Sequence, residues 1–288
     1  MLTLQILANG LVLGGLYACI AAGFSLVWGV LNVINILHGS IIVLGGYLAF
    51  FGYTQLGIHP FFSLLVAAPL FFAFGYFLQS ALINRMIAAP VLLTLSLTFG
   101  LDLMVQNGML LAFTADFRKI ILDPPLGVLA LGPVVIPIDR LLAMALALGL
   151  TGLLYLVLSG SRIGRAIVAV RMDREASALM GVNVRRIYAV TFGLGALMAG
   201  VAGTLLAMIY PISPLAGTTY LGKAFVICVL GGLGSVPGAM VGGLALGVVE
   251  SFGGLWLGPE HATTLSFLLL IAVLLVRPTG LLGRKGYE

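Results

Sequence analysis

Residues 4–29 of the chain read LQILANGLVLGGLYACIAAGFSLVWG, an apolar run without a single charged side chain. A transmembrane α-helix takes about 20 such residues, because each residue advances it by about 1.5 Å through a hydrocarbon core of about 30 Å. The first charged residue of the chain is Arg85. No basic segment precedes the run, so we expect a first membrane span here and not a cleaved signal peptide.

The composition extends this expectation to the whole chain. Of its 288 residues, 61% are hydrophobic and 8% are charged, and the mean hydropathy is +1.20. Soluble domains carry about 25% charged residues, so these figures exclude a soluble enzyme, a disordered chain and a disulfide scaffold. An outer-membrane barrel would show a weaker, alternating hydropathy. We predict one all-α polytopic membrane domain over 1–288.

Apolar segments recur along the chain between short polar interruptions. The segment 219–231 is too short to cross a bilayer by itself. We therefore predict about eight full transmembrane helices plus one short, broken or re-entrant helix. The predicted segments are 4–29, 36–54, 61–84, 91–113, 139–158, 187–210, 219–231, 236–257 and 262–277.

Glycine and polar residues interrupt the helices near 29–40 and at 231–238. Broken helices survive at membrane depth only where they are buried in protein or line a cavity, and in transporters they mark the pathway. The breaks fall at matching places in two helical pairs, 4–54 and 219–257, which favours a parallel internal duplication. A structural interpretation stays open, in which the polar side chains satisfy freed backbone groups. The pathway candidates in the breaks are Asn32, Asn35, His38, Gly39, Ser40, Gly232, Gly234 and Ser235.

Asp102, Glu250 and Lys223 are charged residues in the interior of apolar segments. Asp102 is near the middle of 91–113, where a carboxylate is costly, so it is either a pathway residue or a structural partner of a neighbouring helix. Thr94 and Ser96 on the same segment are further pathway candidates. Glu250 and Lys223 lie nearer to segment ends, and we expect both to extend toward water.

Small residues recur at every fourth position in three segments, which places them on one helix face and predicts close helix packing. The rows are Gly10, Gly14, Ala18 and Ala22; Gly195, Ala199 and Gly203; and Ala239, Gly243 and Gly247. Cys19 and Cys228 lie in apolar runs as packing residues. No catalytic or metal-binding motif is present in the sequence, so we expect neither enzyme chemistry nor a metal site.

The net charge of +5 is concentrated in residues 162–186, which hold six arginines and two acidic residues. The positive-inside rule places the loop 159–186 in the cytoplasm. Alternation of the spans then puts the amino terminus outside and the carboxyl terminus inside. The proline- and glycine-rich segment 114–138 becomes an ordered external loop. Arg85, Arg277, Arg284 and Lys285 agree with this orientation, and Arg118, Lys119 and Arg140 oppose it.

Within that loop, residues 171–181 predict a short amphipathic helix. Asp173 is a suitable N-cap and Gly181 a suitable C-terminal stop. Ala176, Leu179 and Met180 share one face at helical spacing. Such a helix could lie on the membrane surface, but its small residues favour docking to a soluble cytoplasmic partner.

Four stretches resemble the branched-chain amino acid permeases of the LivH type, and together they span nearly the whole chain. The segment EASALMG at 175–181 is similar to the EAA-type coupling loop of ABC importer permeases. The other three are NVINILHG at 32–39, VLGGLGSVPGA at 229–239 and RPTGLLG at 277–283, in the order that the family shows.

The resemblance implies a type II-like ABC importer permease for branched-chain or related hydrophobic amino acids, in the cytoplasmic (inner) membrane of a bacterium or archaeon. It implies a second homologous permease subunit, two cytoplasmic ATP-binding subunits and an extracytoplasmic solute-binding protein that meets 114–138. The chain would have no cofactor of its own, since the partner subunits would bind the ATP. The implied coupling residues are Arg171, Asp173, Glu175, Ala176, Ala178, Leu179 and Gly181.

Other functions stay open at the level of sequence. Relatives of such permeases move urea, short amides or aromatic acids. A stand-alone secondary transporter or channel could use Asp102 as a proton or cation site, and a membrane scaffold would move no solute. Asp102 has no place in the family pattern, so the preferred charge of the solute is open as well.

Overall fold

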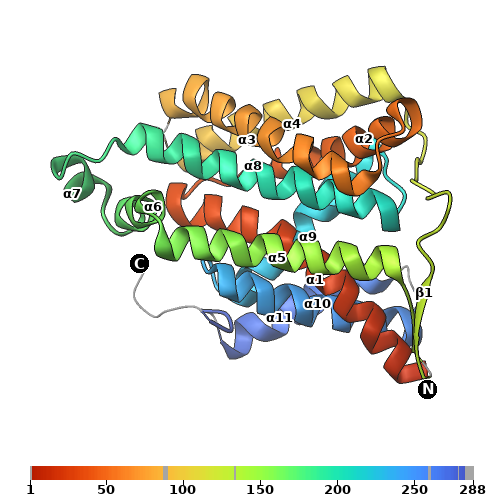
Figure 1. Cartoon of the computed structure of the whole chain (residues 1–288). Helices are drawn as coiled ribbons and strands as arrows, with labels where there is room; N and C mark the ends of the chain where they lie inside the picture. Colours follow the sequence, from red (N-terminus) through yellow and green to blue (C-terminus); the bar gives the residue numbers. More distant parts are fainter. Residues whose placement is uncertain (1, 87–89, 133, 259–260, 278, 283–288) are drawn as a thin grey trace.

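The computed structural model describes residues 2–86, 90–132, 134–258, 261–277 and 279–282. Within these ranges the chain forms helices and one short hairpin (Figure 1). The elements are α1 (Leu2–Leu31), α2 (His38–Leu56), α3 (Pro60–Ala81), η1 (Ile83–Arg85), α4 (Val91–Phe113), β1 (Val128–Leu131), β2 (Val134–Pro137), α5 (Ile138–Gly160), α6 (Arg162–Met172), α7 (Arg174–Leu179), α8 (Val184–Ile209), η2 (Pro214–Ala216), α9 (Gly217–Gly231), α10 (Val236–Trp256) and α11 (Ala262–Val276).

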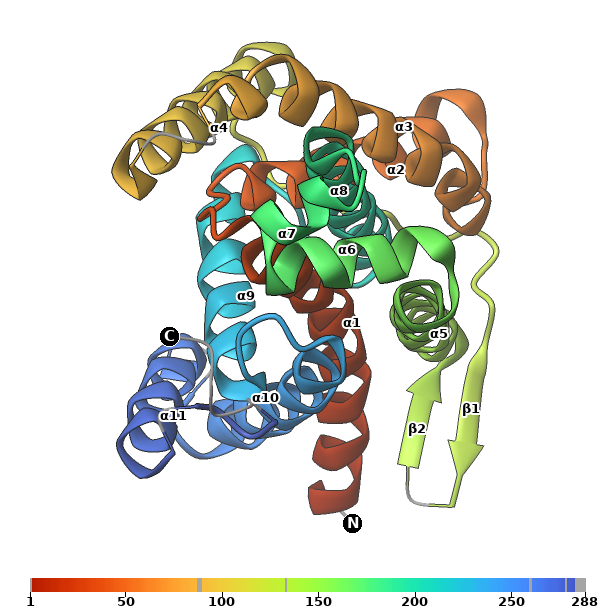
Figure 2. The ribbon, with the colours of Figure 1, turned by 90° about the vertical axis from the view of Figure 1, so that its left-hand side faces the viewer.

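The long helices run side by side between two ends of the molecule. The arginine-rich α6 and α7 lie at one end, which we call the basic end, and the β1–β2 hairpin lies with the amino terminus at the other, the hairpin end (Figure 1). Figure 2 looks onto the basic end and shows α1 near the centre, with α3, α4 and α11 toward the outside. In their most apolar stretches α1 and α8 are 89% buried, against 17% for α4. The core therefore forms around α1 and α8.

In the part of the chain that the structure describes, eight helical segments are long and apolar enough to cross a membrane, so the predicted polytopic all-α fold is confirmed. The sequence did not show one detail of their lengths. The turn η2 extends the short α9 into an 18-residue segment, Pro214–Gly231, whereas α11 has only 15 residues. Proline is accepted in the first turn of a helix, where its missing N–H is not needed. Pro214 can therefore begin a turn that the apolar pattern leaves out.

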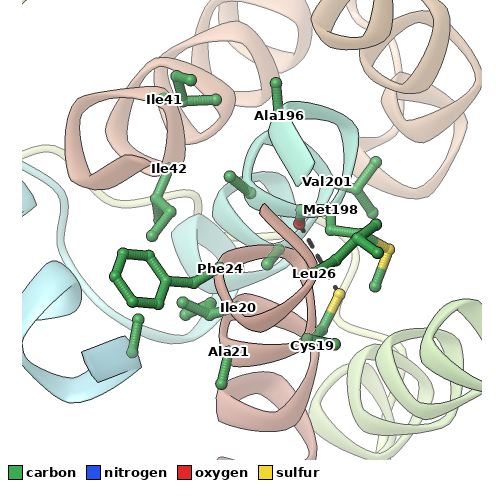
Figure 3. Close-up of a cluster of buried hydrophobic side chains, with 14 of the residues drawn as sticks. Cys19, Ile20, Ala21, Phe24, Leu26, Ile41, Ile42, Ala196, Met198 and Val201 are labelled. Carbon is green, nitrogen blue, oxygen red and sulfur yellow. Dashed lines mark hydrogen bonds between the residues drawn. The ribbon is translucent and has the colours of Figure 1, made fainter. Parts of the chain in front are cut away.

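Helices α1, α2 and α8 meet in a core of apolar side chains (Figure 3). Phe24, Ile41 and Met198 come from the three helices, and each is at most 2% exposed. The Cys19 sulfur lies 3.8 Å from the Met198 carbonyl oxygen, and Cys228 is also buried and unbridged. Both cysteines thus pack inside the bundle, as their apolar sequence context predicts.

Two of the predicted small-residue rows pack against each other across α1 and α10. A Cβ atom placed on Gly14 would lie 2.7 Å from the Leu244 Cα, and one placed on Gly10 would lie 2.8 Å from the Val248 Cα. The third row faces α1 and α2, since Gly195 approaches Gly23 and Gly203 approaches the Ile42 carbonyl. Backbones can come this close only where side chains are absent or very small, so the predicted packing role is confirmed.

The hairpin end is ordered by pairing between backbone groups. Strands β1 and β2 are antiparallel, with Leu131 opposite Val134. The Gln5 side chain holds the hairpin on α1: its amide nitrogen donates to the Val135 oxygen, and its amide oxygen accepts from the Val135 nitrogen, both at 2.8 Å. The backbone of Arg118 also pairs with that of Ile212. The described residues of 114–138 thus form an ordered loop, as predicted, and they contain a hairpin.

Replacing Gly14 by alanine is expected to destabilise the protein by about 1–3 kcal/mol, because the added methyl group forces α1 and α10 apart. Gly149 on α5 has open space around its Cα, so Gly149→Ala adds helix propensity alone and is expected to raise stability slightly. Thermal unfolding of the purified variants measures both effects. Equal shifts for the two variants would contradict the packing role of Gly14.

Candidate translocation and coupling site

The first break lies inside the bundle. Helix α1 ends at Leu31, and Asn32 turns the chain with a φ of 52°. Helix α2 then begins at the fully buried His38, whose Nε2 lies 3.0 Å from the carbonyl oxygen of Ile20. Ile20 precedes the end of α1 by about three turns, or about 16 Å at about 1.5 Å per residue. The segment before His38 therefore re-enters the bundle, and α2 starts at mid-depth.

At the start of α2, a carboxylate from α4 takes the place of an N-cap side chain. Its N-cap residue, Leu37, offers no side-chain hydrogen bond. Asp102 of α4 is 6% exposed and accepts a hydrogen bond of 2.5 Å from the Ser40 hydroxyl, and the Ser40 backbone also bonds to it. A negative charge is stabilised at the positive end of a helix dipole. Two predicted pathway residues, Ser40 and Asp102, are therefore direct partners.

A second contact from α4 supports the same break. The Thr98 hydroxyl, one turn before Asp102, donates to the Ile34 carbonyl oxygen at 2.9 Å. The Asn35 side chain is different: it is 1% exposed, and neither its amide nitrogen nor its oxygen has a hydrogen-bond partner in the described parts of the chain. An unpaired buried amide costs about 1–3 kcal/mol, so Asn35 has unused hydrogen-bonding capacity, and the Nδ1 atom of His38 is a second buried group without a partner in the described residues.

The second break touches the first. After α9 ends at Gly231, Gly232 and Gly234 adopt φ values of 100° and 75°, and the Ser235 hydroxyl accepts from the Gly238 N–H at 3.1 Å to begin α10. A Cβ atom placed on Gly29 would lie 2.5 Å from the Gly234 Cα. Gly39 in turn approaches the Gly217 carbonyl at the start of α9. The two broken helical pairs thus contact each other at both points, while their origin by duplication stays a prediction.

The chain after α11 completes the second break. The Leu281 N–H donates to the Leu230 oxygen at 2.7 Å, and the Leu282 N–H donates to the Gly231 oxygen at 3.1 Å. These bonds satisfy carbonyl groups that the end of α9 leaves open. In the stretch 277–283, Pro278 and Gly283 lie outside the described residues, as do Arg284 and Lys285.

The basic end reaches this second break directly. The predicted single helix over 171–181 is wrong: Arg171 lies in the last turn of α6, and α7 begins only after Asp173. Asp173 is extended, with a φ of −156°, and its carboxylate accepts from the N–H groups of Glu175 and Ala176 as the predicted N-cap. Because Asp173 interrupts the helix, Arg171 can turn inward, and its guanidinium donates to the Gly234 oxygen at 2.8 Å.

Helix α7 presents its large apolar side chains to the outside. Leu179 is 89% exposed and Met180 is 85% exposed, whereas Ser177 is buried. Ala176 and Ala178 are exposed beside them, and Gly181 ends the turn with a φ of 83°, as predicted. Two adjacent apolar side chains held outward on a capped helix are suited to a protein partner.

The remaining pathway candidates are divided between a cavity and the outer surface. Asn32 and Thr94 line a cavity of about 290 Å³ at the basic end, together with Arg171 and Tyr188. Ser96 is exposed on α4, and its hydroxyl donates to the Leu92 oxygen of its own helix. Ser96 is therefore not brought together with the other candidates. A smaller cavity of about 130 Å³ lies at the hairpin end and includes Asn9, Arg140, Tyr210 and Ser251.

The whole length of the chain has recognisable relatives. A family model described as branched-chain amino acid transport system / permease component matches residues 6–274. The chain belongs to this family. The resemblance seen in its four sequence stretches is thereby confirmed, and the chain is a multi-pass membrane protein of the permease type.

Named relatives agree with this assignment. The permease is 37% identical to the high-affinity branched-chain amino acid transport system permease protein BraD of Pseudomonas aeruginosa, over 99% of this chain and 97% of the relative. It is 37% identical to the corresponding protein LivH of Escherichia coli K12, over the same shares. A probable branched-chain amino acid transport permease protein LivH of Methanocaldococcus jannaschii is 27% identical, over 97% and 92%. No solved structure matches the chain.

Sequence reasoning missed one buried cluster of the permease. Lys223 of α9 and Glu250 of α10 do not extend to water; their side chains are 14% and 4% exposed and form an ion pair of 2.6 Å. The Lys223 ammonium also donates to the Tyr17 hydroxyl of α1 at 2.5 Å. The sequence did contain a signal for this pair, namely opposite charges in two apolar segments, since charges at membrane depth are usually paired. Water was the wrong partner to expect, because α1 covers both side chains.

Lys223→Met is expected to destabilise the permease by about 3–5 kcal/mol, since it leaves the Glu250 carboxylate buried without its counter-ion. The double variant Lys223→Met, Glu250→Gln removes both charges and should recover most of that loss. Thermal unfolding in detergent measures the difference, with Arg165→Gln, at an exposed position of α6, as a control for charge loss. A double variant as unstable as the single one would contradict the pairing.

Proposed function

We propose that this permease is the membrane-spanning subunit of an ATP-driven importer for branched-chain or related hydrophobic amino acids. The membership of its family supports the solute class. The observation that carries the coupling is the hydrogen bond from Arg171 to the Gly234 oxygen, because it joins the segment that bears α7 to the break between α9 and α10. The chain then transports without catalysing a reaction, and partner subunits bind the ATP.

The proposed orientation is supported by the charge of the basic end. With α6 and α7 in the cytoplasm, the arginines of 162–186 satisfy the positive-inside rule in a bacterial or archaeal inner membrane. The amino terminus and the β1–β2 hairpin then lie outside, where an extracytoplasmic binding protein can deliver the solute. A second homologous permease and two cytoplasmic ATPases complete the proposed assembly.

Coupling proceeds through contacts that the fold already contains. An ATPase that holds Leu179 and Met180 moves α7 and, with it, the end of α6. Arg171 passes this displacement to Gly234, and Gly234 lies against Gly29 in the first break. Small shifts at a packed junction of this kind can bias a bundle between two arrangements. The solute path then opens alternately toward the hairpin end and the basic end.

The direct test is uptake by vesicles that contain the permease with its partner subunits and binding protein. Labelled leucine is expected to enter only when ATP reaches the ATPases, and a protonophore should leave uptake unchanged. Unlabelled isoleucine and valine should compete, whereas urea, acetamide and an aromatic acid should not. Uptake that needs a proton gradient and ignores ATP would assign the chain to secondary transport through Asp102, and competition by urea or amides would change the solute class.

The docking role of α7 has its own test. Leu179→Glu places a charge on the exposed apolar pair and is expected to reduce recovery of the ATPase subunits with the tagged permease by about tenfold or more, since burying an unpaired charge at an interface costs at least 1.4 kcal/mol. Leu126→Glu makes the same change at the hairpin end, where Leu126 is 40% exposed, and should leave ATPase recovery intact. Normal recovery with Leu179→Glu would rule out α7 as the docking helix.

A further inference from the structure

The cavity at the basic end combines charged and aliphatic walls. Arg171 and Arg174 contribute two guanidinium groups, and Tyr188 contributes a phenol that bonds to Arg174. Aliphatic side chains, among them Val33, Val91 and Val170, form other parts of the lining. At about 290 Å³ the cavity has the size of a small-molecule site.

The charge of this cavity selects anions. Two of its ten lining residues are arginines and none is acidic. The nearest carboxylate in sequence, Asp173, already accepts two hydrogen bonds from the start of α7. Guanidinium groups bind carboxylates in a planar, two-pronged geometry, and a phenol hydroxyl can add a donor to the same oxygen atoms.

We propose that this cavity binds a small carboxylate with an aliphatic side chain, namely the imported amino acid after its release, and that the occupied cavity slows further transport. This inference rests on the proposed function for the identity of the solute and for the cytoplasmic position of the basic end. The arginines hold the carboxylate, and the valines receive the branched side chain. Asn32 and Thr94, which line the same cavity, offer oxygen atoms to the ammonium group.

Arg171 supplies the mechanism of inhibition. The same guanidinium that lines the cavity donates to the Gly234 oxygen. A carboxylate carries a negative charge and can accept two parallel hydrogen bonds from a guanidinium, so it is a stronger partner for Arg171 than a neutral carbonyl oxygen. A bound amino acid therefore competes with Gly234 for Arg171 and weakens the contact that joins the docking segment to the broken helix. Transport slows as the product accumulates inside.

The test uses the complete importer in vesicles that are preloaded with ATP and with one internal compound. Internal leucine is expected to slow the initial uptake of labelled leucine severalfold compared with vesicles that hold ATP alone. Internal leucinamide has the same side chain but no carboxylate, and it should have little effect. Equal inhibition by leucinamide, or no inhibition by leucine, overturns the proposal.

Arg174→Gln examines the site itself, because Arg174 lies on the exposed side of the cavity. The internal leucine concentration for half-inhibition, measured relative to each variant's own unloaded vesicles, should rise about tenfold or more, which is the worth of one charge-assisted hydrogen bond. Arg165→Gln removes the same charge from α6 outside the cavity and should inhibit like the unchanged protein. Unaltered inhibition in Arg174→Gln overturns the assignment.

Two further experiments test whether the cavity binds a phosphate group in place of the amino acid carboxylate. Internal inorganic phosphate should not inhibit, and adding phosphatidylglycerol to the vesicles should not replace the effect of leucine. Inhibition that follows phosphate or phosphatidylglycerol in place of leucine overturns the proposal in favour of a phosphate site.

A binding measurement keeps this inference separate from the proposed function. Tritiated leucine should bind the complex of permease and ATPases without the binding protein, and Arg174→Gln should weaken that binding. If unloaded vesicles take up no leucine, the proposed function fails. If they take it up, but internal leucine neither inhibits nor binds, the further inference alone fails.

Discussion

The structure depends on one constraint: inside a bilayer, each backbone group freed by a helix break must find its partner within the protein. The chain meets this constraint by packing its two breaks together and surrounding them with donors and acceptors. Asp102 accepts a hydrogen bond from Ser40 at the start of α2, Thr98 bonds to the first break, and Arg171 bonds to the second. Leu281 and Leu282 close the end of α9. Glycines allow the backbones to approach, because a Cβ atom on Gly29 would press on Gly234.

The same arrangement makes the breaks responsive to events at the surface. An intact helix would resist local displacement, since each of its peptide groups bonds to the next turn. A break held by one side chain can shift when that side chain moves. Arg171 occupies this position, because it lies in the last turn of α6, two residues before the Asp173 cap of α7, and bonds to Gly234. The contacts that stabilise the broken helices therefore also connect them to the exposed Leu179 and Met180.

Local sequence patterns predicted most of the fold but few of its long-range contacts. Hydropathy located the nine apolar helices of the described residues to within a few residues at each end. Four-residue spacing located the packed glycine rows, and capping chemistry located both ends of α7. The division between α6 and α7 was missed, because the stretch before residue 171 was assigned to the cytoplasmic loop on its arginines, and Arg171 and Met172 were joined to the helix that follows. The pairs Ser40–Asp102 and Lys223–Glu250 join residues far apart in sequence. Their geometry depends on which helices become neighbours, and no single segment encodes that.

The buried charges and the cavities divide the polar chemistry of the molecule. Asp102 accepts from Ser40, and Glu250 forms an ion pair with Lys223 within the bundle, so these charged groups already have partners in the protein and are poor candidates for holding a solute. The arginines that face cavities are at the two ends: Arg140 with Asn9 and Tyr210 at the hairpin end, and Arg171 and Arg174 with Asn32 and Tyr188 at the basic end. The two cavities thus share a guanidinium, a phenol, an amide and aliphatic neighbours, and α1 lines both. A solute with one carboxylate and an apolar side chain finds the same kinds of partner at either end. The two ends therefore offer the solute the same kinds of contact. Similar contacts at both ends let a pathway bind a solute on one side and release it on the other.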